Sequence, residues 1–188
     1  MKNSEDVIVF GGSFDPVTKA HVAIAQEVKK ITGKKIVFMP VSDGYGKRSL
    51  KASFIDRYRM LEIVTSIGDG LEVSDLEEEF YLRYKRQPKT IETLELLQKR
   101  DVKPALLLGL DNYLHIDRWY KGKKIKEDFK IYVYPRGIQD IDDEVVIKGV
   151  KLYDISSSKI KDAIVDHIYD DLDPKVKEYI ITHHLYQG

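Results

Sequence analysis

The segment at residues 11–21, which reads GGSFDPVTKAH, has the residue types of a phosphate-binding loop. Gly11 and Gly12 have no Cβ, so their backbone N–H groups can approach an anion closely. The apolar spacing that follows predicts a helix, and the N-terminus of a helix carries a positive partial charge. Because the spacing is neither G-x-G-x-x-G nor G-x-x-x-x-G-K-[ST], the segment is not a dinucleotide fingerprint or a Walker loop.

His21 is the candidate side chain for chemistry in this segment. It would lie in the first turn of the predicted helix, on the apolar face formed by Ile24, Ala25 and Val28. Its imidazole would then point toward the edge of a sheet. A histidine that packs in the core beneath the loop explains the same spacing equally well.

Residues 154–161, which read DISSSKIK, form a second candidate anion site toward the other end of the chain. Serines cap helix N-termini and leave backbone N–H groups for an anion, and a cation one turn later adds a charge-assisted contact. That cation is Lys161, a point charge without the two-pronged geometry of arginine. Taken alone, the three serines at residues 156–158 are explained more simply as an ordinary helix cap.

The elements that must position these residues alternate along the chain. Short β-branched runs predict strands at residues 7–10, 35–39, 71–74, 105–108, 130–134 and 150–153. Apolar residues three and four apart predict helices that contain residues 21–31, 55–64, 91–97, 156–167 and 174–184, with Asp173 as the cap of the last one. Most of the strands are apolar throughout, as parallel strands buried on both faces are. We therefore expect a doubly wound, mainly parallel α/β sheet with C-terminal helices and a ligand crevice at the carboxyl ends of its strands.

Composition narrows the class of protein further. With 188 residues the chain is long enough for one substantial core, so we expect a single domain over residues 1–188. Lys+Arg and Asp+Glu both number 31, and a chain of zero net charge lacks the field that holds nucleic acid or an anionic membrane. The longest apolar stretch, residues 104–110, is shorter than the roughly 20 residues that span a bilayer. Because no apolar stretch is long enough to span a bilayer, we expect a soluble cytoplasmic protein. The absence of cysteine excludes disulfides, thiolate zinc sites and a cysteine nucleophile.

The first segment resembles the G-G-T-F-D-P-x-H-x-G-H signature of the nucleotidyltransferase superfamily of adenylyl- and cytidylyltransferases. Ser13, Thr18 and Ala20 depart from that signature, and a threonine at the position of Thr18 is familiar in phosphopantetheine adenylyltransferases. Residues 154–161 resemble the I-S-S-T-x-I-R motif with which these enzymes hold ATP phosphates, with Lys161 in place of the arginine. The two motifs lie near opposite ends of the chain, so they support one another.

Five further segments resemble the nicotinate/nicotinamide mononucleotide adenylyltransferases, so the resemblance covers nearly the whole chain. Residues 40–47 (PVSDGYGK) and 57–60 (RYRM) are similar to the P-V-x-D-x-Y-x-K and R-x-x-M pattern. Residues 88–94 (PKTIETL) resemble the x-T-x-x-T-L segment, and residues 134–137 (YPRG) resemble the R-x-G segment. The most discriminating piece is GLDN at residues 109–112, followed seven positions later by Trp119.

The resemblance implies adenylyl transfer from ATP to the 5′-phosphate of nicotinate or nicotinamide mononucleotide, with release of pyrophosphate. It implies catalytic roles for His21, Thr18 and Lys47. It implies ATP contacts from Gly11, Gly12, Ser13, Phe14, Gly109, Asp111, Ser157, Ser158 and Lys161. Asp111 would be a buried carboxylate that accepts a ribose hydroxyl, and Thr90, Trp119 and Arg136 would contact the mononucleotide. Mg²⁺ would arrive with ATP and take few protein ligands. The expected partners are these two substrates, and a homo-oligomer stays open.

Each of these roles has a simpler structural alternative. Lys47 is explained equally well as a surface lysine of a loop, and Thr90 as the cap of a helix. Trp119, which the resemblance places against the pyridine ring, is alternatively a large core residue. A phosphopantetheine adenylyltransferase and a catalytically silent nucleotide-binding domain also remain open. A metal hydrolase that uses His115, His167, His183 and His184 is disfavoured, because adjacent histidines point to different faces of a helix and no carboxylate is suitably spaced.

Overall fold

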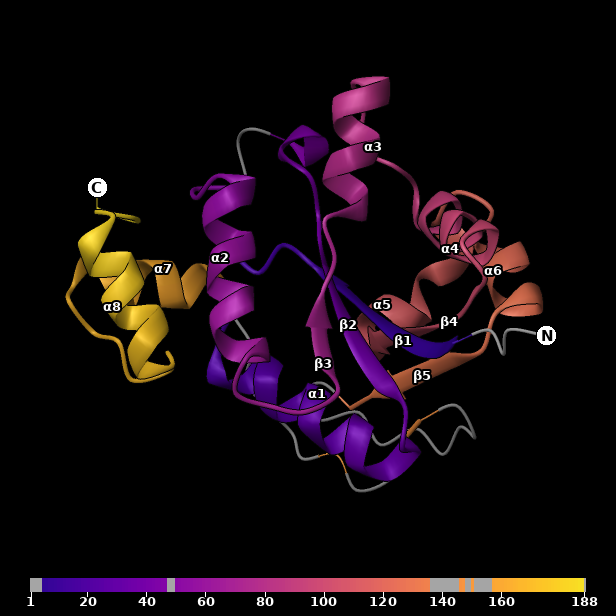
Figure 1. Ribbon diagram of the computed structural model, residues 1–188, viewed down its shortest axis with the longest axis horizontal. Coiled ribbons are helices and arrows are strands. Elements are labelled where there is room, and N and C mark those ends of the chain that lie inside the picture. The colour runs from indigo at the N-terminus through magenta and orange to yellow at the C-terminus, as the bar shows by residue number, and fades with distance from the viewer. Residues whose placement is uncertain (1–4, 47–49, 136–145, 148–149, 151–156, 188) are drawn as a thin grey trace.

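The computed structural model describes residues 5–46, 50–135, 146–147, 150 and 157–187. Its sheet consists of five parallel strands: β1 (Glu5–Gly12), β2 (Lys35–Pro40), β3 (Leu71–Val73), β4 (Val102–Gly109) and β5 (Ile131–Tyr134). The predicted doubly wound parallel sheet is therefore confirmed (Figure 1). The sixth predicted strand, residues 150–153, lies outside the described residues except for Val150, which is buried and is not in a strand.

The strand order β3-β2-β1-β4-β5 places β1 at the centre of the sheet. The chain runs outward from β1 through β2 to β3, and then returns to pair β4 with the other side of β1. Phe10 consequently pairs with Phe38 on one side and with Leu107 on the other. In such a sheet the winding reverses between β1 and β4, and ligands bind beyond the carboxyl ends of the strands at that point.

Helices cover both faces of the sheet (Figure 1). One face packs against α1 (Lys19–Thr32), α2 (Phe54–Thr65), α7 (Ser157–Val165) and α8 (Pro174–Thr182). The other packs against α3 (Leu76–Tyr84), α4 (Thr90–Lys99), α5 (Leu110–Leu114) and α6 (Gly122–Asp128), with the short 3₁₀ helix η2 (Ile116–Arg118) among them. A second 3₁₀ helix, η1 (Asp43–Tyr45), follows β2. All five predicted helices are present, whereas α3, α5 and α6 were not predicted.

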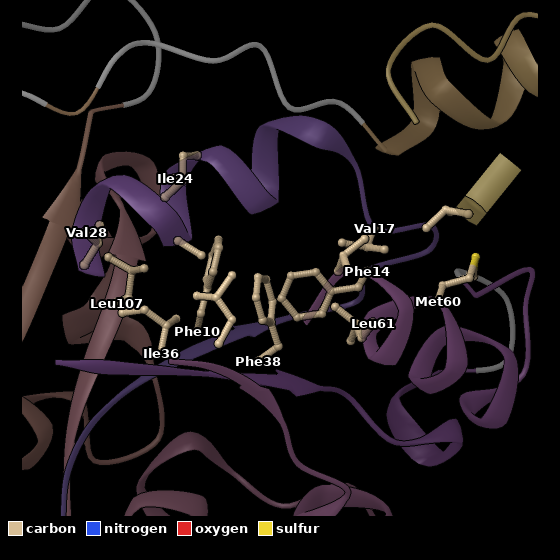
Figure 2. Close-up of a cluster of buried hydrophobic side chains, with 14 of the residues drawn as sticks. Phe10, Phe14, Val17, Ile24, Val28, Ile36, Phe38, Met60, Leu61 and Leu107 are labelled. Carbon is tan, nitrogen blue, oxygen red and sulfur yellow. The ribbon is translucent and has the colours of Figure 1, made fainter. Parts of the chain in front are cut away.

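The central strands bury alternate residues in two separate cores. Ile8 and Phe10 of β1 belong to the core beneath α1 and α2, and Val7 and Val9 belong to the core beneath α4 and α6. Figure 2 shows the first of these cores, in which Phe14 lies against Phe10 and Phe38. Burial on both faces explains why the strand sequences are apolar throughout.

Helix caps fix where the chain enters the helices near the site. Thr18 is the N-cap of α1, and its hydroxyl accepts a hydrogen bond from the backbone of the third helical residue. Asp173 caps α8 ahead of Pro174, as predicted. Within the described ranges, none of the helices combines the length and the apolar character that crossing a bilayer requires.

Candidate active site

The carboxyl end of β1 leads into a tight loop whose packing requires glycine at position 12. A Cβ on Gly12 would lie 3.0 Å from the ring of Phe14, closer than side-chain carbons normally approach. The Phe14 ring is itself buried and packs edge-on against Phe10, with 5.6 Å between ring centroids. Phe14 is therefore a core residue, and the loop presents backbone groups rather than this ring to a ligand.

His21, the third residue of α1, is held by the residue that caps this helix. The backbone N–H of Thr18 donates to Nδ1 of His21 over 3.1 Å, and the Thr18 hydroxyl lies 2.9 Å from the same nitrogen. Because Nδ1 accepts from a backbone N–H, a neutral His21 carries its proton on Nε2. The ring is largely buried and lies against Phe14. This geometry suits both interpretations drawn from the sequence, the packed histidine and the phosphate donor.

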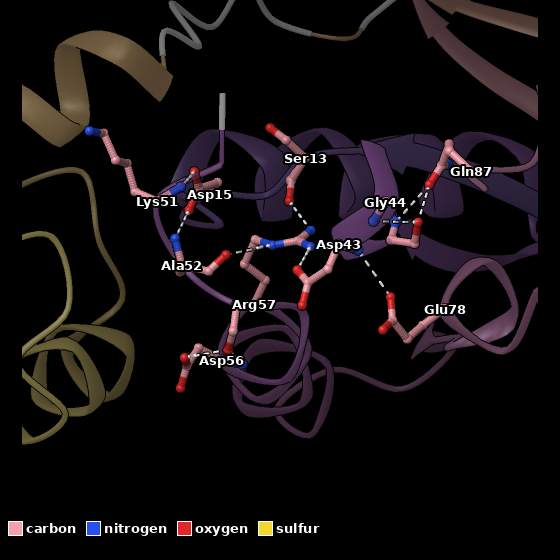
Figure 3. A network of polar contacts seen from close by, with 12 residues as sticks. Ser13, Asp15, Asp43, Gly44, Lys51, Ala52, Asp56, Arg57, Glu78 and Gln87 are labelled. Atoms are coloured by element: carbon pink, nitrogen blue, oxygen red, sulfur yellow. Dashed lines mark hydrogen bonds and ion pairs between the residues drawn. The ribbon is translucent and has the colours of Figure 1, made fainter. Parts of the chain in front are cut away.

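Asp15 joins four distant parts of the chain at the base of the loop. Its buried Oδ1 accepts from the backbone N–H of Ala52 at 3.0 Å and from the hydroxyl of Tyr186 at 2.8 Å. Its Oδ2 accepts from the backbone N–H of Lys51 at 2.8 Å (Figure 3). The same oxygen lies 3.4 Å from Nζ of Lys161. Burial, and then the negative charge of Asp15, raise the pKa of Tyr186, so this hydroxyl remains a donor. Lys161 thus reaches the first loop from α7 and forms an ion pair there.

Arg57, the arginine of the R-x-x-M segment, is fully buried beside the same loop. Its guanidinium donates to the carbonyl of Ser13 at 2.9 Å, to the carbonyl of Ala52 at 3.3 Å, and to Oδ1 of Asp43 at 3.3 Å (Figure 3). One side chain of α2 therefore fixes the first loop and η1 relative to each other. We refer to Asp15, Thr18, His21, Arg57 and Lys161 together as the first-loop cluster.

A cavity of about 530 Å³ opens at the carboxyl ends of β1 and β4, where the strand order reverses. This volume is within the usual range for small-molecule sites. The rings of Tyr45, Trp119 and Tyr120 line it, so we refer to it as the aromatic cavity. The predicted crevice at the carboxyl ends of the strands is therefore present.

The aromatic cavity brings together four of the residues singled out in the sequence. Gly11 and Gly12 line one part of it, and Thr90 and Trp119 line another. Trp119 is half-buried against the core beneath α4, so it is at once a core residue and a wall of the cavity. The cavity lining does not include His21, Thr18 or Lys161, which belong to the first-loop cluster.

Two expectations about single residues are wrong. Asp111 is exposed rather than buried, because it lies in α5 just beyond the carboxyl end of β4. A Cβ at the neighbouring Gly109 would lie 2.9 Å from Oδ1 of Asp111 and 3.1 Å from the ring of Tyr134, so a larger residue there would have to displace both side chains. Thr90 is not the cap of its helix: Lys89 is the N-cap of α4, and Glu92 accepts the Lys89 backbone N–H at 2.8 Å.

Four predicted site residues cannot be placed in full. Lys47 and Arg136 lie outside the described residues. Ser157 and Ser158 form the first turn of α7, as expected for a helix start, but their side chains are outside the described part of the structure.

His183 and His115 each contact a backbone carbonyl four residues earlier in the chain. Nδ1 of His183 contacts the carbonyl of Tyr179 at 2.9 Å, and the two rings stack at 3.9 Å. Nδ1 of His115 contacts the carbonyl of Asp111 at 2.7 Å in the same manner. Among the described residues no three His, Asp or Glu side chains are grouped so as to hold a metal ion.

Three residues of this region received no role from the sequence. Asp15 and Arg57 lie within recognisable motifs, but the contacts that make them important come from segments far away along the chain. Glu77 lines the aromatic cavity and is buried, although it begins a run of three glutamates that is typical of a solvated helix face. No local pattern distinguishes it from Glu78 and Glu79.

Comparisons with known proteins identify the family of the chain. The cytidylyltransferase-like family matches residues 9–163. A probable nicotinate-nucleotide adenylyltransferase from Acholeplasma laidlawii is 32% identical over 96% of this chain and 97% of its own length. A protein of the same name from Caldicellulosiruptor saccharolyticus is 31% identical over 96% of this chain and 98% of its own. The solved structure of Plasmodium falciparum nicotinic acid mononucleotide adenylyltransferase complexed with NaAD has a TM-score of 0.80 at 22% identity, and the match covers 97% of both chains. The chain therefore belongs to the cytidylyltransferase-like family of nucleotidyltransferases, in the group of nicotinate-nucleotide adenylyltransferases.

Proposed function

We propose that this chain transfers the adenylyl group of ATP to the 5′-phosphate of nicotinate mononucleotide, or of nicotinamide mononucleotide, to form the dinucleotide. The observation that carries the proposal is the aromatic cavity, in which the glycines of the first loop and Trp119 line one space. Backbone N–H groups at the end of β1 suit a phosphate, and an aromatic wall suits a pyridine ring. The names of the relatives support the reaction, as do the complexes of the P. falciparum enzyme with NaAD and with APC.

The reaction makes one phosphorus–oxygen bond and breaks another. An oxygen of the acceptor 5′-phosphate attacks the α-phosphorus of ATP, and the bond from that phosphorus to the bridging oxygen breaks. Pyrophosphate leaves with the electron pair. The acceptor phosphate is ionised at neutral pH, so the reaction needs no strong general base. Catalysis then depends on holding two anions in line and stabilising the charge that develops on the oxygens.

In this proposal His21 donates from Nε2 to an oxygen of the α- or β-phosphate. Thr18 occupies Nδ1 and so fixes both the tautomer and the orientation of the ring. His21 is then the catalytic residue, and Thr18 is a positioning residue that acts through it. The backbone of Gly11 and Gly12 provides the close approach for the phosphates.

The leaving pyrophosphate is assigned to the N-terminus of α7, with Ser157, Ser158 and Lys161. Asp15 holds Lys161 at 3.4 Å, a distance that keeps the cation beside the loop. Asp111 is exposed at the carboxyl end of β4, where its carboxylate can accept a ribose hydroxyl. Lys47 and Arg136 retain the phosphate contacts that the family resemblance gives them.

Mg²⁺ enters the proposal bound to ATP. This ion keeps most of its coordination to phosphate and water oxygens. The donor set of the described residues, which contains no group of three His, Asp or Glu, fits an ion held mainly by the triphosphate. When bound, it would neutralise part of the phosphate charge. The proposal also comprises a single domain, a cytoplasmic location and no nucleic-acid or membrane partner.

Pyrophosphate release with ATP and Mg²⁺ tests the proposal directly. The acceptors to compare are nicotinate mononucleotide, nicotinamide mononucleotide, 4′-phosphopantetheine and glycerol 3-phosphate. Turnover on a pyridine mononucleotide is the expected result. The relative rates also show whether the protein prefers nicotinate mononucleotide or nicotinamide mononucleotide. Turnover on phosphopantetheine alone would overturn the assignment of Trp119, and ATP binding without turnover on any acceptor would indicate a silent nucleotide-binding domain.

A further inference from the structure

Glu77 places a buried carboxylate against the aromatic cavity. It lies in the first turn of α3, and only 8% of its surface is exposed. Its Oε1 accepts from the hydroxyl of Thr93 at 2.8 Å, and its Oε2 accepts from the side-chain amide of Gln87. Both partners also line the cavity.

The groups that hold Glu77 are all neutral. Gln87 uses its carbonyl oxygen to accept from the backbone N–H of Ser42 at 2.9 Å and from the Ser42 hydroxyl. Figure 3 shows Gln87 reaching toward the loop that contains Gly44. This network fixes the orientation of the carboxylate but supplies no positive charge. Within the described residues, Glu77 forms no ion pair with lysine, arginine or histidine.

Among the described residues, the other elements around the cavity do not compensate the charge either. Lys89, at the start of α4, is the other charged side chain in the described lining, and it is exposed. The titratable groups that remain in the lining are the phenols of Tyr45 and Tyr120, which are neutral at physiological pH. β1, β2 and β4 contribute apolar side chains and glycines to the lining. Burial consequently raises the pKa of Glu77 to about 7.

An uncompensated carboxylate in an aromatic cavity is suited to a cation. Aromatic faces attract cations, and the attraction is stronger when water is excluded. In a pyridine mononucleotide the ring nitrogen is bonded to the ribose, so the ring carries a fixed positive charge. We propose that Glu77 is a specificity-determining residue that selects an acceptor whose heterocycle is permanently cationic over one whose heterocycle is neutral. The inference rests on the proposed function, since it concerns the acceptor of that reaction.

Glu77→Gln removes the charge and can keep the hydrogen bonds. The amide oxygen can accept from Gln87, and the amide N–H₂ can donate to Thr93, whose hydroxyl serves as donor or acceptor. Glu79→Gln is the matched control, because Glu79 lies on the same helix, is half exposed and pairs with Arg100 at the surface.

The experiment compares nicotinamide mononucleotide with its 1,4-dihydro form, whose ring is uncharged. Titration calorimetry measures the Kd of each ligand, and pyrophosphate release measures kcat/KM. The wild-type protein should prefer the cationic ring, and Glu77→Gln should reduce that preference about tenfold while KM for ATP stays unchanged. Glu79→Gln should behave as wild type.

A pH series adds a second readout. Between pH 6 and pH 8 the affinity of the wild-type protein for the cationic ring should rise relative to that of Glu77→Gln, because ionisation of Glu77 creates the counter-charge. The acceptor phosphate also titrates near pH 6 but does so equally with both proteins. Equal losses for the cationic and neutral rings in Glu77→Gln, or parallel pH profiles, would overturn the proposal. Calorimetry tests the role of Glu77 separately from the proposed function. If the protein binds the cationic ring more tightly but shows no turnover, the reaction is refuted and the role of Glu77 is retained.

Discussion

The first-loop cluster and the aromatic cavity lie at the same edge of the sheet, but the charged side chains of the two regions have opposite kinds of partner. In the cluster, Asp15 receives four donors that include Lys161, and Arg57 has three oxygen acceptors that include the carboxylate of Asp43. In the cavity, Glu77 has neutral partners. We infer that paired charges in the first-loop cluster fix the backbone that binds phosphate. In the aromatic cavity, the charge of Glu77 stays available for the pyridine ring of the acceptor.

Replacing Arg57 should produce the largest loss of stability. Arg57→Met leaves the carbonyls of Ser13 and Ala52 without this donor and removes the partner of Asp43, so the free energy of unfolding should fall by about 3–5 kcal/mol. Urea denaturation measures the change. Arg59→Met on the same helix is the control, because its pair with Glu62 is exposed and screened by solvent, so its loss should change the free energy of unfolding far less. Equal losses in the two variants would contradict the role of Arg57.

His21→Ala should separate chemistry from folding within the first-loop cluster. The variant loses a donor to the transferring phosphate, so kcat should fall by about 10²–10³. Steady-state pyrophosphate release measures this, and circular dichroism checks that the variant is folded. His183→Ala, which alters a histidine stacked on Tyr179, should leave kcat unchanged. An unaltered kcat in His21→Ala would show that the ring is only a packed residue.

The uncompensated charge of Glu77 should be visible in the pH dependence of stability. Its folded-state pKa of about 7 lies above the ordinary 4.5, so the folded protein binds this proton more tightly than the unfolded chain does. The resulting stabilisation is present at low pH and is lost as the pH rises from about 4.5 through 7. Relative to Glu77→Gln, the wild-type protein should lose about 3 kcal/mol between pH 4 and pH 8. Urea denaturation at each pH measures the free energy of unfolding of both proteins. If the two values change in parallel over this range, the charge of Glu77 is compensated by another group in solution.

Trp119→Ala gives the smallest of the expected effects and tests the aromatic cavity alone. Loss of the aromatic wall should raise KM for the mononucleotide about tenfold and leave KM for ATP nearly unchanged. Trp119→Phe should restore much of the affinity, since it keeps an aromatic face. A similar increase in both KM values would indicate that Trp119 acts through the core it packs against.

The sheet was predictable because its strands obey a local rule. Val7, Ile8, Val9 and Phe10 are apolar because the two faces of β1 enter two different cores. The helix α3 was not predictable by the same means, since it buries only Leu76 and Glu77 and exposes much of the rest. α5 and α6, of five and seven residues, are too short to show a helical period.

The residues of the site were predictable only where a motif carried them. Gly11, Gly12, Thr90 and Trp119 come from three separate segments and line one cavity. The bond from Tyr186 to Asp15 spans 171 positions, and no periodicity or motif indicates a contact between residues so far apart. The exposure of Asp111 likewise follows from its place in α5 beyond the strand end rather than from the GLDN segment itself.

The most direct test of the account is a crystal structure of the protein with the product dinucleotide. The account predicts that the pyridine ring lies in the aromatic cavity against Trp119, with its charged nitrogen toward the side of Glu77. It also predicts that the pyrophosphate bridge lies at the backbone of Gly11 and Gly12, within hydrogen-bonding distance of Nε2 of His21. A pyridine ring bound outside the cavity, or a pyrophosphate remote from the first loop, would contradict the account.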